Sequence, residues 1–141
     1  MSATATPSKP AAPASPSLAI GKQLVALYNQ GKAAEAVDTL SAQNIVSIEA
    51  MEMPGMPART EGLAAVKARK KAFYDNSTIH ATSADGPWPH GDRFIVTFTI
   101  DMTAKAGPMA GQRMHMKEAA LFTVQNGKIT QEEFFYPGCE Q

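Results

Sequence analysis

One stretch of the chain, residues 93–103, limits the possible folds more than any other. Its apolar side chains stand at every second position, and threonine and aspartate occupy most of the positions between them. The alternating apolar residues are Phe94, Val96, Phe98, Ile100 and Met102. A period of two is typical of a β-strand that buries one face. We therefore expect a long strand here with one side on the core.

Further strands are expected on both sides of this one, separated by glycine- and proline-rich turns. The expected strands are residues 78–83, 112–124 and 128–136. The expected turns are residues 86–91, 107–111 and 126–127. The second half of the chain thus has the pattern of an antiparallel meander.

The first half has helical spacing instead. Ile20, Leu24 and Leu27 recur at intervals of three and four residues, and Ser17 can cap the start of that helix. Further elements are helices at residues 33–40 and 63–74, a β-branched strand at 44–49 and a loop at 51–60. Early helices and late strands predict an α+β domain, in which one curved antiparallel sheet wraps around about three N-terminal helices.

The length of 141 residues, with 44% hydrophobic residues, suits one packed domain. Residues 1–17 are rich in proline, alanine and serine and lack large apolar residues after Met1, so a disordered tail is expected there. The domain is expected at residues 18–136, followed by a short tail at 137–141. The apolar runs are shorter than a secretory signal core or the roughly 18 residues of a membrane span, so we expect a cytoplasmic protein without membrane contact.

Charge and motif content exclude several classes of function. Thirteen Lys and Arg residues balance 13 Asp and Glu residues, which argues against nucleic acid as a partner. The single cysteine, Cys139, and the three histidines, His80, His90 and His115, do not form a metal-ligand pattern. Phosphate-loop and dinucleotide motifs are missing as well, so we expect neither a metal nor another cofactor.

Several short motifs carry a resemblance to a known family. They are residues 31–36 (GKAAEA), 44–49 (NIVSIE), 61–66 (EGLAAV), 92–94 (DRF) and 122–129 (FTVQNGKI). In their order and spacing, residues 20–136 resemble the nuclear-transport-factor-2-like superfamily, in its SnoaL-like and ketosteroid-isomerase-like branch. The resemblance implies a cone-shaped fold with an apolar cavity, homodimers packed through the outer sheet face, and either cofactor-independent chemistry or binding alone. The chemistry of the family includes isomerisation, cyclisation, dehydration and epoxide opening.

Two carboxylates are the candidate catalytic residues. The resemblance implies that the catalytic base lies at the end of the first strand, where Glu49 falls. Glu118 lies in the largely apolar stretch 118–122, where burial beside a cavity favours the protonated acid. Alternatively, either carboxylate faces solvent or an ion-pair partner. In ketosteroid isomerase, a tyrosine of the first helix and a protonated strand aspartate donate hydrogen bonds to the substrate oxygen. The resemblance places that tyrosine near Leu24, one turn before Tyr28, and that aspartate near Ala120. These two hydrogen-bond donors are therefore not matched directly.

The residues that line the cavity depend on the turn at residues 126–127. A two-residue turn places Phe135 opposite Glu118, whereas a three-residue turn with a glycine bulge places Phe134 opposite Glu118 and Glu132 opposite Ala120. The resemblance favours the bulge. The side chains then expected inside are those of Met116, Glu118, Ala120, Phe122, Glu132, Phe134 and Tyr136, together with Phe98. Leu121, Ile129 and Phe135 are then expected on the outer face.

Three other features have both a functional and a structural interpretation. Trp88 either closes the cavity mouth or packs on the sheet edge. Met51, Met53 and Met56 either form a lid or pack on the core. The basic cluster on residues 63–74 is interpreted as a solvated helix face; it consists of Lys67, Arg69, Lys70 and Lys71.

Two functions remain open from the sequence. The first is a small cofactor-free isomerase, cyclase, hydratase or other lyase that acts on a small apolar molecule, with Glu49 as base and Glu118 as acid. The second is a non-catalytic dimeric module that binds a ligand or acts as a scaffold. In both cases the expected partners are a small apolar molecule and a second copy of the chain.

Overall fold

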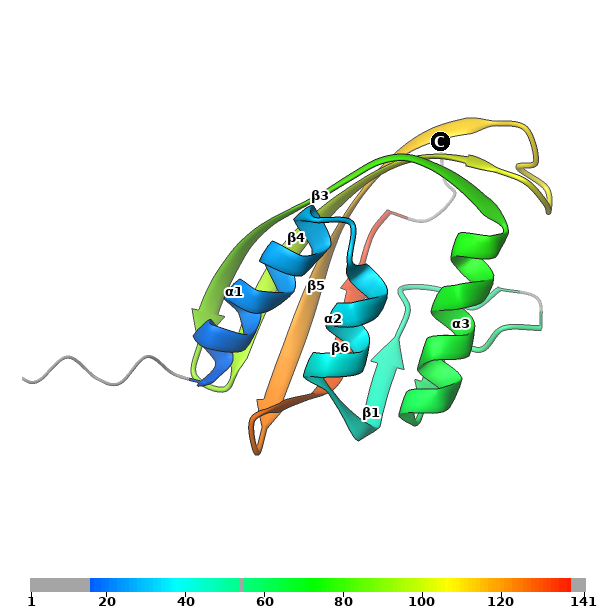
Figure 1. Ribbon diagram of the computed structural model, residues 1–141. Coiled ribbons are helices and arrows are strands. Elements are labelled where there is room, and N and C mark those ends of the chain that lie inside the picture. Colours follow the sequence, from blue (N-terminus) through cyan, green and yellow to red (C-terminus); the bar gives the residue numbers. More distant parts are fainter. Residues whose placement is uncertain (1–15, 54, 138–141) are drawn as a thin grey trace, which may run out of the picture.

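The computed structural model describes residues 16–53 and 55–137, which form three helices and one six-stranded sheet (Figure 1). The helices are α1 (Pro16–Asn29), α2 (Ala33–Leu40) and α3 (Leu63–Asp75). The strands are β1 (Ser41–Ile48), β2 (Arg59–Glu61), β3 (Ser77–His90), β4 (Arg93–Ala104), β5 (Arg113–Gln125) and β6 (Lys128–Phe135). The predicted α+β class is confirmed.

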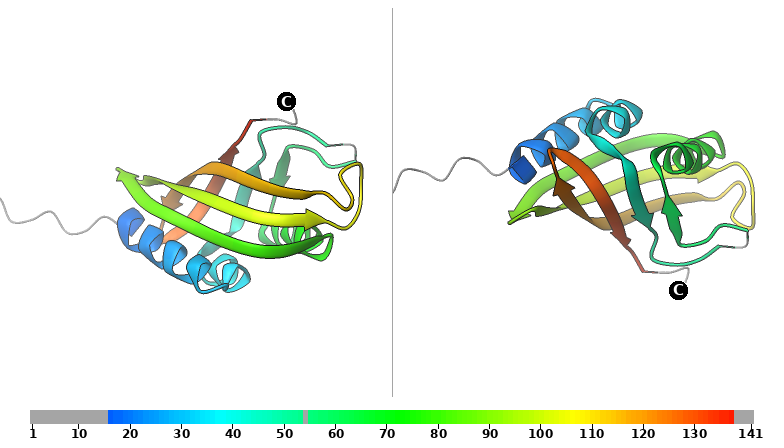
Figure 2. Two further views of the ribbon diagram at one scale, coloured as in Figure 1. Left: turned by 90° about the horizontal axis from the view of Figure 1, so that it is seen from above. Right: turned by 90° about the horizontal axis from the view of Figure 1, so that it is seen from below.

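The sheet is curved and unclosed, and its strand order is β2-β1-β6-β5-β4-β3. Strands β3, β4 and β5 arch over α1, and all three helices lie on the concave side of the sheet (Figures 1 and 2). One prediction needs correction, because β1 runs parallel to β6 and the sheet is therefore mixed. Local patterns predict hairpins, but they do not reveal which strand the first strand joins across the whole domain.

The alternation in β4 is confirmed by the burial of its side chains. All five alternating side chains are buried. Phe94, Val96 and Phe98 pack in the main core with helix residues, whereas Ile100 and Met102 form a second apolar cluster with residues of the neighbouring strands. The Phe94 ring stacks on Phe122 of β5 at a centroid distance of 4.9 Å. Burial of one strand face against the helices is thus the main source of the core.

The turn predicted at residues 86–91 is wrong in extent. Strand β3 continues to His90 with a register shift between Asp85 and Trp88, and the chain reverses only at Gly91 and Asp92. Pro87 and Pro89 are tolerated because β3 is an edge strand, where one row of backbone groups has no strand partner.

Strand β6 contains a bulge at a position that the turn residues 126–127 do not predict. Asn126 and Gly127 form a two-residue turn, and Ile129 pairs with Val124, but the register shifts before Gln131. After the shift Phe134 pairs with Ala120, and Glu132 pairs with Phe122. The predicted inward face of Glu132 and Phe134 is therefore right, whereas their predicted partners are wrong.

Ile129 is a second correction that follows from the same bulge. It is buried in the core and not on the outer face, because it precedes the point at which the bulge exchanges the two faces of the strand. Leu121 is half-buried and Phe135 is exposed, as an outer-face position requires.

The start of α1 is tied to the sheet. Ser17 is buried, and its hydroxyl donates a hydrogen bond of 2.7 Å to the carbonyl oxygen of Gly91. Pro16 and Ser17 therefore belong to the fold. Pro137 is described after the end of β6, while residues 1–15 and 138–141 of the expected tails lie outside the described residues. No helix among the described residues is long and apolar enough to cross a membrane.

Candidate functional site

A cluster of titratable side chains lies on the concave side of the sheet, between helix α3 and strands β1, β5 and β6. Its members come from every layer of the fold, and several interact electrostatically. They are Tyr28, Glu49, Lys70, Tyr74, Glu118, Glu132 and Tyr136. Apart from Glu132, these side chains are half-buried, so water reaches the cluster. We refer to this set as the interior cluster.

Glu49 follows Ile48, the last residue of β1, where the chain leaves the sheet. Its backbone N–H donates to the carbonyl oxygen of Ala58, which fixes the backbone at this point. The Tyr136 hydroxyl donates a hydrogen bond of 3.0 Å to Glu49 Oε2. Burial and the nearby Glu49 carboxylate raise the pKa of Tyr136 to about 12, so the phenol remains a neutral donor at physiological pH.

Glu118 lies on β5 opposite Phe98, in a largely apolar environment. Its carboxyl group makes no hydrogen bond with any residue that the structure describes. Burial, followed by repulsion from Glu49, raises the pKa of Glu118 to about 7, although Lys70 opposes the shift. Near neutral pH this carboxyl group therefore exists in both the acid and the carboxylate forms.

Lys70 connects helix α3 to strand β6 through Glu132 and Phe134. Its ammonium lies 3.0 Å from Glu132 Oε2 and 5.0 Å from the centroid of the Phe134 ring. Only 5% of the Glu132 side chain is exposed, against 30% of the Lys70 side chain. Burial alone would lower the pKa of Lys70, but Glu132 and Glu49 raise it above its usual value, so the side chain stays charged.

The interpretation of the basic cluster on α3 as a solvated face is wrong for Lys70. Lys67 pairs with Asp38 and Lys71 pairs with Asp75, and these four side chains are largely exposed. Lys70 instead lies one helical turn after the buried Val66 and one turn before Tyr74. The i, i+4 spacing from Val66 was the sequence signal that could have placed Lys70 inside.

Tyr28 and Tyr74 complete the cluster on the helix side, and neither was predicted from the sequence to belong to the site. The Tyr28 ring packs on Phe98 with a centroid distance of 4.6 Å. Burial, the charge of neighbouring groups and a hydrogen bond with Tyr74 raise the pKa of Tyr28, so it remains protonated. The cluster thus combines three phenols, three carboxyl groups and one ammonium.

The remaining predicted site residues lie at different distances from this cluster. Phe98 and Phe134 are buried on the concave face, beside it. Met116 also faces inward, but it packs in a separate apolar cluster with Ile100 and Met102. Trp88 lies on the outer face, 54% exposed, and is not brought to the cluster.

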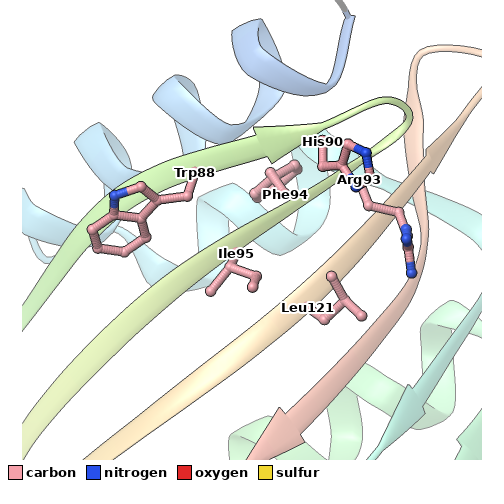
Figure 3. Close-up of a pocket in the computed structure, with 6 residues that line it drawn as sticks. All are labelled: Trp88, His90, Arg93, Phe94, Ile95 and Leu121. Carbon is pink, nitrogen blue, oxygen red and sulfur yellow. The ribbon is translucent and has the colours of Figure 1, made fainter.

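Two hollows, of about 220 and 300 Å³, lie on the outer face of the sheet, on the side opposite the helices and the interior cluster. Figure 3 shows the first, with Trp88, Ile95 and Leu121 on the near side of the sheet and the helices behind it. The second is lined by Ile95, Ala119, Ala120, Leu121 and Phe135. Met53 and Met56 pair in a small bridge and are exposed, so they do not fill the interior.

The histidines lie away from the interior cluster. His80 is hydrogen bonded to Thr103, and His115 lies 3.8 Å from Asp101, which also pairs with Arg113. Within the described residues, no group of three histidine, cysteine, aspartate or glutamate side chains has a geometry suited to a metal ion.

A curved sheet with helices on its concave side is the fold of the α+β class whose solved members are described as NTF2-like or ketosteroid isomerase-like. Within this class the chain belongs to the SnoaL-like family, because the model of the SnoaL-like domain matches residues 17–136. None of the curated proteins matches the chain.

Solved structures support the same assignment. A Mesorhizobium loti protein, named as a candidate SnoaL-like polyketide cyclase with carbohydrate phosphatase as a second description, is 39% identical. The match covers 84% of this chain and 97% of that protein, with a TM-score of 0.77.

More distant structures show the fold alone. A candidate polyketide cyclase from Pseudomonas putida is 16% identical, with a TM-score of 0.64 over 89% of this chain and 94% of that one. A ketosteroid isomerase-like protein from Catenulispora acidiphila, solved in complex with trimethylamine, is 17% identical, with a TM-score of 0.63 over 84% and 85% of the two chains.

Proposed function

We propose that the protein binds a small, largely apolar molecule at the interior cluster and catalyses cofactor-independent proton transfer on it, as an isomerase, a cyclase or another lyase. Glu49 is the base and Glu118 is the acid. The observation that carries the proposal is the difference between these two carboxyl groups. Glu49 accepts a hydrogen bond from Tyr136, whereas Glu118 has no such partner among the described residues and a pKa raised to about 7.

The chemistry follows from this difference. A carboxylate held by a neutral phenol can take a proton from carbon, and a carboxyl group that titrates near neutral pH can return one. Phe98, Phe134 and Tyr28 offer apolar contact area for the rest of the ligand. The polyketide cyclase names of the related structures support a carbonyl-bearing ligand.

The test is proton exchange at carbon. The α-protons of 1-indanone exchange in D₂O, and we expect the wild-type protein to accelerate this exchange over buffer at pH 7, as followed by proton NMR. Loss of a general base typically costs about 10²- to 10⁴-fold, so Glu49→Gln should remove most of the acceleration and Glu118→Gln should reduce it. Glu133→Gln is the matched control, because Glu133 lies on the other face of β6, opposite Leu121. Equal exchange in all four folded proteins would contradict the proposal.

A second candidate function is a non-catalytic dimeric module that binds a ligand or acts as a scaffold, and the outer face supports the dimer that it requires. Trp88, Ile95 and Phe135 are large apolar residues that are 54%, 41% and 50% exposed. They lie around the two outer hollows, and exposed apolar surface of this kind favours association. We propose that a second copy of the chain covers this face. Dimerisation is compatible with either function, so it does not replace the exchange experiment.

A further inference from the structure

The interior cluster holds one positive charge, and the proposed acid–base pair does not use it. Lys70 carries three N–H donors on its ammonium. The structure gives this group one hydrogen-bond acceptor among the described residues, Glu132, at 3.0 Å. The other donors have no protein acceptor in the described part of the chain, and 30% of the side chain remains exposed.

We propose that Lys70 binds the substrate oxygen on which negative charge develops, and that the substrate is therefore an enolisable carbonyl compound. This inference rests on the proposed function and narrows its substrate class. An aldehyde, a ketone or an ester fits the arrangement of Glu49 and Lys70, so the reaction does not require an epoxide as substrate. Glu49 and Tyr74 also interact electrostatically with the ammonium, so the cation and the candidate base belong to the same cluster.

The proton and electron count is complete without a cofactor. Glu49 takes the α-proton, the C–H electron pair forms a carbon–carbon double bond, and the carbonyl π pair moves to oxygen. The Lys70 ammonium then donates a hydrogen bond to the enolate oxygen, a charge-assisted bond that is stronger for the anion than for the ketone. Glu118 in its acid form then supplies a proton to the product, and the proton held by Glu49 returns to Glu118 through the water that reaches the half-buried cluster, which restores both carboxyl groups.

The position of Lys70 is fixed from three sides, which suits a group that must be in place before reaction. Glu132 holds the ammonium from β6, the Phe134 ring lies 5.0 Å from it, and the stem emerges from the same helix face as Val66. Glu132 keeps the charge on the nitrogen, so Lys70 acts as a hydrogen-bond donor and not as a nucleophile. A fixed donor of this kind lowers the cost of reorganisation during reaction.

The experiment measures the ionisation of a bound phenol, which does not depend on turnover. 4-Nitrophenol titrates near neutral pH, and its phenolate absorbs visible light and resembles an enolate in charge. We expect the bound probe to have a pKa higher by at least about one unit in Lys70→Gln than in the wild type, a tenfold change in the ionisation constant, because one nearby cation is lost. In Lys70→Arg the pKa of the bound probe should lie close to the wild-type value, since this variant keeps the positive charge.

Two control variants test whether the shift of the probe is specific to Lys70. Lys71→Gln removes an exposed lysine of the same helix, and Arg93→Gln removes the cation that lines an outer hollow. Both should titrate the probe as the wild type does. Circular dichroism confirms that each variant is folded.

The outcomes separate the inference from the proposed function. If folded Lys70→Gln ionises the bound probe as the wild type does, or if Arg93→Gln alone shifts it, the role of Lys70 is overturned while the exchange test of Glu49 stands. If the wild type does not bind the probe at millimolar concentration, the inference fails together with an interior binding site. If Glu49→Gln loses exchange activity but Lys70→Gln does not change the pKa of the bound probe, the proposed function stands. Only the role of Lys70 and the restriction to enolisable carbonyl substrates are then overturned.

Discussion

The Tyr136 hydroxyl lies 3.0 Å from Glu49 Oε2, although 87 positions of sequence separate the two residues. This contact joins the end of the last strand to the end of the first, where β1 and β6 run side by side. It also gives the candidate base a neutral hydrogen-bond donor. The parallel pairing of β1 and β6 therefore has a direct consequence for the site.

Tyr136→Phe tests that contact. The substitution removes one half-buried hydrogen bond to a carboxylate, so we expect the free energy of unfolding to fall by about 1 kcal/mol. Urea denaturation with a tyrosine-independent probe, such as far-UV circular dichroism, measures the change. An unchanged midpoint would show that the hydroxyl contributes nothing to the junction of β1 and β6.

Glu118 should make the stability depend on pH between about 4.5 and 7. Its pKa is raised from 4.5 to about 7 in the folded protein, so the folded state binds the proton more tightly than the unfolded chain. The stabilisation is complete below pH 4.5 and is lost as the pH rises through 7. We expect the wild type to lose about 3 kcal/mol relative to Glu118→Gln over this range, as measured by urea denaturation at several pH values. Parallel pH profiles of the two proteins would contradict the burial of the acid.

Gly21 tests the packing of α1 on β3. A Cβ atom at this position would lie 2.6 Å from Pro87 Cβ, so Gly21→Ala must displace the helix or the strand. In an exposed helix the same substitution is stabilising by up to about 1 kcal/mol, whereas here we expect a loss of about 1–3 kcal/mol. Gln23→Ala, at an exposed position of α1, is the control that should have little effect. A more stable Gly21→Ala protein would show that the helix does not pack this closely.

The outer face should control the oligomeric state. We expect the wild type to have the mass of a dimer at micromolar concentration, and Ile95→Asp or Phe135→Asp to have that of a monomer, because each buries a charge in the contact. Gln23→Asp, at an exposed position of α1 on the opposite side of the sheet, is the control that should keep the mass of the wild type. Sedimentation or light scattering measures the masses. A monomeric wild type would contradict the dimer.

The sequence predicted strand β4 and the general fold. The apolar residues alternate along β4 in the sequence, and the burial of its side chains alternates in the same way in the structure. It did not predict the bulge in β6, since Thr130 looks like any strand residue and the register depends on the pairing with β5. The same limit explains Ile129, which is placed by its pairing with Val124 and not by its own neighbours in sequence.

The two carboxylates were predictable as candidates, but their surroundings were not. Glu49 stood out because the family resemblance implies a base at the end of the first strand, and Glu118 stood out by its apolar neighbours. Lys70 was hidden among other cations on α3, because composition indicated a solvated helix face and only the buried Val66 marks the inner side. Trp88 was misleading, since its turn-like sequence did not reveal that β3 continues through it on the outer face.

The most direct test is a carbon-13 NMR titration of the glutamate side-chain carboxyl groups, with the Glu118 signal assigned by its loss in Glu118→Gln. The arrangement of Glu118 beside Phe98, Glu49 and Lys70 leads us to expect an apparent pKa of about 7. A Glu118 carboxyl that titrates at the value of about 4.3 usual for exposed glutamates would remove the proton donor from the site.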